Sequence, residues 1–199
     1  MSNYLTNIEK FARQNKIPVI LDDTKDYLQN LCKELKPKHI LEIGMAIGYS
    51  ASCMLEVCDA DILELEASLP NIELARQNFE NLGFTDRVKI IVGDCVVELA
   101  KLLGQKFDLI FLDGPKGHYP EMLPDILPLL ADNGVFVSDN VLFRGMVRDG
   151  ENISSPRYVH TVKALQKFLE LLEKNENLDT KVLHIGDGLA VVKKKIKGK

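Results

Sequence analysis

The stretch Lys38-His-Ile-Leu-Glu-Ile-Gly-Met-Ala-Ile-Gly-Tyr-Ser50 decides the fold of this chain. Its mostly apolar residues 40–43 predict a buried parallel strand with one acidic interruption at Glu42. Gly44 stands where the strand should end, and Gly48 stands where a helix should begin. Glycines in such a turn let a ligand approach the backbone and the helix N-terminus. The stretch therefore predicts a strand–turn–helix with a ligand site at the turn, although an ordinary glycine-rich turn would show the same pattern.

The spacing of this turn indicates what kind of ligand it takes. Glu42-x-Gly44-x-x-x-Gly48 differs from the Gly-x-Gly-x-x-Gly of a dinucleotide-binding turn, which has a glycine in place of the glutamate. A diphosphate needs bare N–H groups, whereas a carboxylate suits a cationic ligand such as the amino group of an amino acid. An NAD-dependent oxidoreductase is therefore only a distant alternative, on fold grounds alone.

Strands and helices alternate on both sides of this stretch. Further strands are expected over residues 61–66, 88–92, 107–112 and 135–138, and a C-terminal hairpin over 181–185 and 189–193. Helices are expected over residues 3–15, 22–35, 48–58, 70–82, 96–103, 118–130 and 156–174, with a turn at Asn133-Gly134 and a polar loop over 141–155. The pattern predicts an α/β fold, a mainly parallel seven-stranded sheet with helices on both faces and one antiparallel strand from the hairpin.

Length and composition limit the classes of protein. The 199 residues fit one domain over residues 1–199, and we expect the helices of residues 1–36 to cover the cofactor and substrate side. A net charge of −4 gives no general attraction for nucleic acid or an anionic membrane. The four cysteines form no Cys-x-x-Cys pair, which predicts free thiols. Without a signal peptide or a membrane-spanning run, the sequence predicts a cytoplasmic protein, which we expect to be a homodimer.

Acidic residues follow almost every expected strand, at the edge where an open parallel sheet binds its ligand. Glu66 ends the second strand, where a carboxylate can accept two hydrogen bonds from a ribose diol. Asp94 ends the third strand and is placed either for an adenine amino group or as a helix N-cap. Cys95 would then lie near the ring. These positions predict a nucleoside-containing cofactor.

Asp113 and Asp139-Asn140 follow two strands that are expected to be neighbours, so their ends should lie roughly 5 Å apart. Two carboxylates at that range repel one another unless a cation lies between them. Three hard oxygen donors suit Mg²⁺, Mn²⁺ or Ca²⁺. Lys116 can reach the same crevice as a base, although a solvated loop lysine would fit the sequence too.

Three segments together resemble the catechol-type, cation-dependent O-methyltransferases of the class I S-adenosylmethionine (SAM) fold. They are Ile40-Leu-Glu-Ile-Gly-Met-Ala-Ile-Gly-Tyr-Ser-Ala51, Phe111-Leu-Asp-Gly-Pro-Lys-Gly-His-Tyr119 and Ser138-Asp-Asn-Val-Leu-Phe-Arg-Gly145. The chain is most similar to the bacterial branch that methylates 5-hydroxyuridine at the tRNA wobble position, giving 5-methoxyuridine. The resemblance implies a Rossmann-like fold, with SAM and Mg²⁺ (or Mn²⁺ or Ca²⁺) as cofactors.

The resemblance also implies a role for each matching residue. Glu42, Gly44 and Ser50 would hold the methionine part of SAM, Glu66 the ribose, Asp94 and Cys95 the adenine, and Ile20 would make a backbone contact to the cofactor. Asp113, Asp139 and Asn140 would bind the metal, with Asp113 also at the cofactor and in catalysis, and Lys116 would be the base.

The acceptor is harder to predict than the reaction. Met45, Cys95 and Gly114-Pro115 depart from residues common in the family, and the acid that the animal catechol enzyme places near its C-terminal hairpin has no clear counterpart. Cations gather after the expected metal ligands, which favours the anticodon loop of a tRNA: Arg144, Arg148, Arg157 and Lys163. The lysine-rich residues 193–199 could add to such a contact, although a solvated, disordered end would fit them equally well. The alternative is a small-molecule O-methyltransferase acting on catechol or hydroxycinnamoyl-type vicinal hydroxyls.

Overall fold

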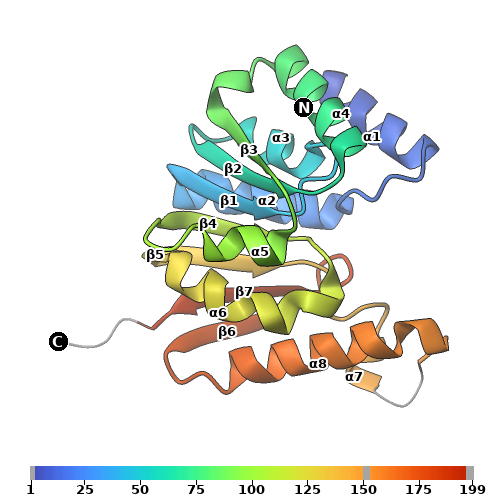
Figure 1. Ribbon diagram of the computed structural model, residues 1–199, viewed down its shortest axis with the longest axis vertical. Helices are drawn as coiled ribbons and strands as arrows, with labels where there is room; N and C mark the ends of the chain where they lie inside the picture. The colour runs from blue at the N-terminus through green and yellow to red at the C-terminus, as the bar shows by residue number, and fades with distance from the viewer. Residues whose placement is uncertain (1–2, 150–152, 196–199) are drawn as a thin grey trace.

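Seven strands form one sheet in the spatial order β3-β2-β1-β4-β5-β7-β6 (Figure 1). The computed structural model describes residues 3–149 and 153–195. Pairing is parallel from β3 to β5, and β7 runs antiparallel to both β5 and β6. The strands are β1 His39–Ile43, β2 Asp61–Glu66, β3 Val88–Val92, β4 Phe107–Leu112, β5 Leu130–Ser138, β6 Leu178–Leu183 and β7 Leu189–Lys194. The order reverses between β1 and β4, which is where such sheets bind ligands.

Helices cover both faces of this sheet, which confirms the predicted fold class. One face packs against α1 Asn3–Gln14, α2 Asp22–Leu35, α3 Tyr49–Leu55 and α4 Leu69–Leu82. The other face packs against α5 Cys95–Ala100, α6 Tyr119–Leu129 and α8 Val159–Glu173. Short helical segments are η1 Thr85–Arg87, η2 Lys116–His118, α7 Met146–Asp149 and η3 Pro156–Tyr158. Figure 1 shows α5 and α6 in front of the sheet and α2 behind it. No helix among the described residues is long and apolar enough to cross a membrane.

Helix α4 illustrates how local sequence sets an element. Ser68 is the N-cap and its side chain accepts from the backbone N–H of Asn71, while Gly83 ends the helix in the left-handed conformation. Its apolar residues recur at helical spacing, and Ile72 and Phe79 are buried against the sheet. Phe79 lies against Gly48, so this packing also supports the first turn of the site.

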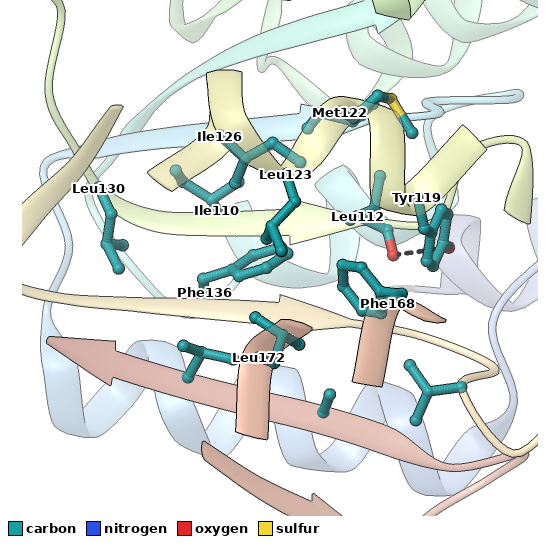
Figure 2. Close-up of a cluster of buried hydrophobic side chains, with 14 of the residues drawn as sticks. Ile110, Leu112, Tyr119, Met122, Leu123, Ile126, Leu130, Phe136, Phe168 and Leu172 are labelled. Atoms are coloured by element: carbon teal, nitrogen blue, oxygen red, sulfur yellow. Dashed lines mark hydrogen bonds between the residues drawn. The ribbon is translucent and has the colours of Figure 1, made fainter. Parts of the chain in front are cut away.

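The core beneath α6 and α8 reaches the carboxyl ends of β4 and β5 (Figure 2). Tyr119 is completely buried there and packs edge-on against Phe168, with ring centroids 5.2 Å apart. Its hydroxyl lies 3.2 Å from the carbonyl oxygen of Leu112 and 3.4 Å from that of Asp139. One side chain therefore ties together the backbone at the ends of two adjacent strands.

Three predicted details differ from the structure. Strand β6 is Leu178–Leu183 rather than residues 181–185, because Leu178 is buried and pairs with Lys194. The expected turn at Asn133-Gly134 lies within β5, where the register with β4 shifts in a bulge. A side chain at Gly134 would meet the carbonyl oxygens of Phe107 and Asp108. The loop expected over 141–155 contains α7, a helix too short to show a periodic pattern.

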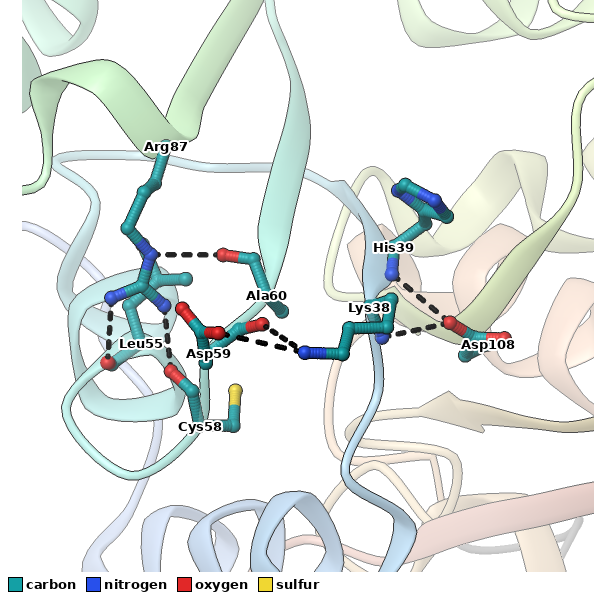
Figure 3. Close-up of polar contacts among 8 residues, drawn as sticks. All are labelled: Lys38, His39, Leu55, Cys58, Asp59, Ala60, Arg87 and Asp108. Atoms are coloured by element: carbon teal, nitrogen blue, oxygen red, sulfur yellow. Dashed lines mark hydrogen bonds and ion pairs between the residues drawn. The ribbon is translucent and has the colours of Figure 1, made fainter.

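Charged side chains fasten the opposite, amino-terminal ends of the strands (Figure 3). The Arg87 guanidinium donates to the carbonyl oxygens of Leu55, Cys58 and Ala60, at 3.4, 2.6 and 3.0 Å. The Asp108 carboxylate accepts from the backbone N–H groups of residues 38 and 39. The Arg87 bonds join the start of β3 to the end of α3 and to the residues before β2, and the Asp108 bonds join β4 to the start of β1.

Replacing Arg87 with alanine should lower the free energy of unfolding by about 2–4 kcal/mol, because it leaves three carbonyl groups without their charged donor. Urea unfolding measures this loss, and Arg76→Ala, at an exposed position on α4, is the control. Cofactor affinity should stay unchanged under native conditions. A stability loss as small as that of the control would show that these bonds contribute little.

Candidate active site at the strand ends

A cavity of about 320 Å³ opens at the carboxyl ends of β1 to β4. It is lined by Pro18, Gly44, Ala46, Leu65, Glu66, Ala67, Asn71, Gly93, Asp94, Cys95, Asp113, Gly114 and Pro115. Larger hollows exist, including one of about 690 Å³ near Pro124 and Leu178, but they lie away from this edge. The cavity thus gathers five residues that the sequence predicts for the cofactor: Gly44, Glu66, Asp94, Cys95 and Asp113.

The two glycines of the first turn are required by close packing. Gly44 has φ +99°, and a side chain there would come within 2.6 Å of the carbonyl oxygen of Asp113. Gly48 has φ +75°, and its added carbon would lie 2.5 Å from the ring of Phe79. Both positions therefore exclude other residues on steric grounds. The turn after β1 packs against the end of β4 at the cavity.

Three residues predicted to hold the cofactor lie behind the cavity wall. Glu42 is completely buried, and Ser50 and Ile20 are almost completely buried. The Ser50 hydroxyl donates to Glu42, which links the first turn of α3 to β1. None of the three lines the cavity, so a direct contact with the cofactor stays a prediction. Of the N-terminal residues described, Pro18 reaches the cavity, and α1 and α2 pack on the sheet face.

Glu66 and Asp94 each make backbone hydrogen bonds in addition to any contact with a ligand. Glu66 Oε2 accepts from the Ala46 N–H at 2.8 Å, and Oε1 accepts from the N–H groups of Ala67 and Ser68 at 3.0 and 2.7 Å. The Asp94 side chain accepts from the Val96 N–H at 2.9 Å as the N-cap of α5. The cap reading of Asp94 is thus confirmed, and its adenine contact stays a prediction.

Glu66 holds the loop of Ala46, so its replacement should affect both the fold and the cofactor. Glu66→Ala should lower SAM affinity by about a hundredfold and also lower stability, because it removes three backbone hydrogen bonds and the acceptor for a ribose diol. Calorimetry with SAM and thermal unfolding measure the two effects. Glu73→Ala, at an exposed position on α4, is the control. If SAM binds Glu66→Ala as it binds wild type, the assignment to the ribose is wrong.

The predicted metal ligands follow adjacent strands. Leu112 pairs with Ser138 in the register of β4 and β5, and Asp113 and Asp139 come directly after them. The Asp139 N–H donates to the Leu112 carbonyl at 3.0 Å. Asn140 lies in the left-handed region with φ 56°, and its N–H donates to Asp139 Oδ1 at 2.6 Å. The structure therefore brings the two acids and the amide to one edge, as the sequence predicts.

The charges at this edge are unbalanced in a way that suits a cation. Burial first, and then the negative charge of Asp113, raise the pKa of Asp139 to about 7. The Lys116 Nζ lies 2.9 Å from Asp113 Oδ1, and both side chains are largely buried. Within residues 3–149 and 153–195, no three His, Cys, Asp or Glu side chains form a metal-binding group. Two carboxylates and one amide still form a donor set that fits Mg²⁺.

Sequence reasoning missed two residues that hold these ligands in place. Tyr119 ties the strand ends, as described above, and Asp187 fastens the loop that follows Asn140. Asp187 Oδ1 accepts from the Arg144 N–H at 2.6 Å, and its carbonyl accepts from the Leu142 N–H at 3.0 Å. Phe143 and Arg144 both have positive φ, at 42° and 58°, so this loop needs such support. Tyr119 lies in one of the segments quoted from the sequence, but only the fold shows which strand ends Tyr119 ties together and which loop Asp187 supports.

Basic and aromatic side chains lie along the loops beyond the metal ligands. Arg144 and Arg157 lie over the ring of Tyr158, at 5.7 and 4.6 Å from its centroid. Arg148 instead pairs with His184 at 3.1 Å. Lys163 is exposed on α8. Of the basic tail, residues 193 and 194 end β7, and residues 196–199 lie outside the described residues.

Comparisons with known proteins give one consistent family. The family model described as O-methyltransferase matches residues 1–195. A catechol O-methyltransferase from Niastella koreensis is 30% identical over 179 residues, covering 84% of this chain and 79% of its own. The SAH-bound methyltransferase PaMTH1 from Podospora anserina has a TM-score of 0.90 at 30% identity, covering 98% of this chain and 89% of its own. An O-methyltransferase from Bacillus cereus in complex with SAH has a TM-score of 0.86 at 25% identity, covering 98% of this chain and 92% of its own.

Proposed function

The chain belongs to the O-methyltransferase family, and from that premise we propose that it transfers the methyl group of SAM to a hydroxyl that has a second oxygen beside it, with a divalent cation at Asp113, Asp139 and Asn140. The observation that supports this proposal is the meeting of these three side chains next to the cavity that holds Glu66 and Asp94. A nucleoside cofactor and a chelating acceptor would then lie side by side.

Different residues of the chain would serve different steps of this reaction. When bound, the cation would supply Lewis acidity toward the acceptor oxygens, and SAM would supply an electrophilic methyl group. Lys116, whose Nζ lies 2.9 Å from Asp113 Oδ1, is placed so that its neutral amine form could take the proton of the acceptor hydroxyl. Pro18, Leu65 and Pro115 give the cavity an apolar part of its lining. Because a negative oxygen and a positive sulfonium neutralise one another, the rate depends mainly on positioning the two reactants.

For the acceptor we propose 5-hydroxyuridine in the anticodon loop of a tRNA, where the 5-hydroxyl and the 4-carbonyl oxygen form the chelating pair. The support is the cluster of Arg144, Tyr158 and Arg157, which combines two cations with one aromatic ring near the metal ligands. Such a cluster suits a phosphate backbone and an unstacked base. A small catechol or hydroxycinnamoyl acceptor offers the same pair of oxygens, and the catechol O-methyltransferase named above favours this second candidate.

The two acceptors can be separated by charge reversal. Arg144→Glu with Arg157→Glu should reduce methylation of hydroxylated tRNA at least tenfold and leave SAM affinity and methylation of a catechol unchanged. Arg76→Glu with Lys89→Glu, which changes exposed cations on α4 and β3, is the matched control. If the first pair methylates tRNA as well as the control does, or if wild type prefers free catechols, the tRNA proposal is wrong.

A further inference from the structure

Two buried glutamates face each other beneath the first turn of the site. Glu42 of β1 and Glu64 of β2 are opposite one another in the strand register, so their side chains lie on the same face of the sheet. Both are completely buried. Their neighbours along the two strands, Ile40 and Ile62, belong to the core under α1–α4. The pair therefore lies in an apolar layer where a free charge is expensive.

Few hydrogen bonds reach the carboxylate oxygens of Glu42 and Glu64. The Ser50 hydroxyl donates to Glu42 Oε1. Within the described part of the chain, no N–H or O–H donor reaches Glu42 Oε2 or either oxygen of Glu64. Two carboxylates cannot bond to one another, because both only accept. A hydrogen bond between them forms only when one carries a proton, and that proton would satisfy both groups at once.

The electrostatic surroundings of the two glutamates also favour protonation of the pair. Burial raises the pKa of Glu42 to about 8 and holds the pKa of Glu64 well above its usual range. The charged or titratable groups that face the pair from neighbouring elements include Asp113 after β4, Glu66 at the end of β2 and Cys53 on α3. Negative charge on Asp113 or Glu66 further favours a protonated pair.

We propose that Glu64 is a positioning residue for the cofactor turn: as a neutral acid it donates its O–H to Glu42, and Glu42 in turn fixes the Ser50 hydroxyl. The chain Glu64–Glu42–Ser50 then joins β2, β1 and the first turn of α3 into one rigid support. Glu42 comes two residues before Gly44, which lines the cavity. A change at Glu64 would reach the methionine side of SAM through Glu42 and Ser50, without touching the ligand.

The shared proton makes this support sensitive to pH, and the stability that it contributes should fall as the pH rises. The pKa of each acid is higher in the folded state than in the unfolded chain. The pair therefore contributes its full stabilisation of the folded state at pH values below the unfolded pKa of about 4.3. Stability is lost as the pH rises through the folded pKa values, which are about 8 for Glu42 and well above the usual range for Glu64. Above that range two negative charges face each other and the turn should loosen.

The first test is the stability of Glu64→Gln as a function of pH. The amide keeps a donor for Glu42 but cannot ionise, so the midpoint of thermal unfolding should rise by about 5–10 °C relative to wild type at pH 9 and change little at pH 5. Glu173→Gln, at an exposed position on α8, is the control and should follow wild type at both pH values. A variant that follows the wild-type midpoint across this range would overturn the shared proton.

The second test separates positioning from simple stability. With calorimetry and SAH as the probe, Glu64→Gln should bind as wild type does at pH 7 and several-fold more tightly than wild type at pH 9. Glu64→Leu fills the space without a donor and should bind about tenfold more weakly at both pH values, although it is folded. SAH binding by Glu64→Leu equal to that of wild type would overturn the positioning role. Because these readouts need no acceptor, they are independent of the proposed substrate.

Discussion

Replacing Asp139 with alanine is expected to reduce methyl transfer about a thousandfold or more. Asp139 is 1% exposed, and burial together with the charge of Asp113 raises its pKa to about 7. Such an acid is costly to keep unless its negative charge serves a bound cation. Loss of one of two carboxylates should therefore remove the cation, whose Lewis acidity contributes several kcal/mol to the rate.

The direct measurement is Mn²⁺ affinity by electron paramagnetic resonance, alongside kcat/KM. Asp139→Asn keeps the acceptor for the Asn140 N–H and should lose metal affinity nearly as Asp139→Ala does. Asp132→Ala, on the same strand but exposed, is the control and should bind Mn²⁺ like wild type. Unchanged Mn²⁺ affinity in both Asp139 variants would remove this residue from the metal site.

Replacing Lys116 with methionine should lower kcat by a factor of about 10²–10⁴, the usual contribution of a general base, and leave SAM affinity unchanged. The reason is geometric: Lys116 Nζ lies at the metal edge, 2.9 Å from Asp113 Oδ1, in a largely buried position. Methionine fills similar space without an amine. KM for the acceptor should change little, because the cation and not Lys116 would bind its oxygens.

Lys116→Arg distinguishes a base from a partner of Asp113. Arginine keeps the positive charge and the ion pair but does not give up its proton at neutral pH. If Lys116 is the base, Lys116→Arg should therefore be as inactive as Lys116→Met. Lys101→Met is the control, since the exposed Lys101 at the C-terminal end of α5 makes a similar ion pair with Glu98, 2.7 Å long. Activity retained by Lys116→Arg would show that charge alone is needed.

The predicted sheet was accurate because its strands follow simple rules. Residues 61–66, 88–92 and 107–112 are bounded by turn residues and match β2, β3 and β4. Their carboxyl ends meet at one edge in any parallel sheet, so Glu66, Asp94 and Asp113 could be placed together from sequence. The hairpin was found, but β6 begins three residues earlier than expected, because the burial of Leu178 depends on packing that the local pattern does not contain.

Supporting residues were harder to find than the residues at the strand ends. Glu64 looks like an exposed position in an alternating strand, and only the register with Glu42 and the cover of α3 and α4 make it a buried acid. Asp187 looks like part of a hairpin turn, and its role depends on a contact with Arg144, 43 residues earlier, which no local spacing reveals. The burial of the strand that contains Glu42 was predicted from sequence, but the absence of Glu42 from the cavity lining was not.

The most direct test of the central claim is transfer of labelled methyl groups from SAM by protein that has been freed of metal. With EDTA-treated protein, no label should pass to hydroxylated tRNA or to a catechol, and Mg²⁺ or Mn²⁺ should restore transfer while Asp139→Ala stays inactive. Methyl transfer that continues at the wild-type rate after complete removal of divalent cations would contradict the account.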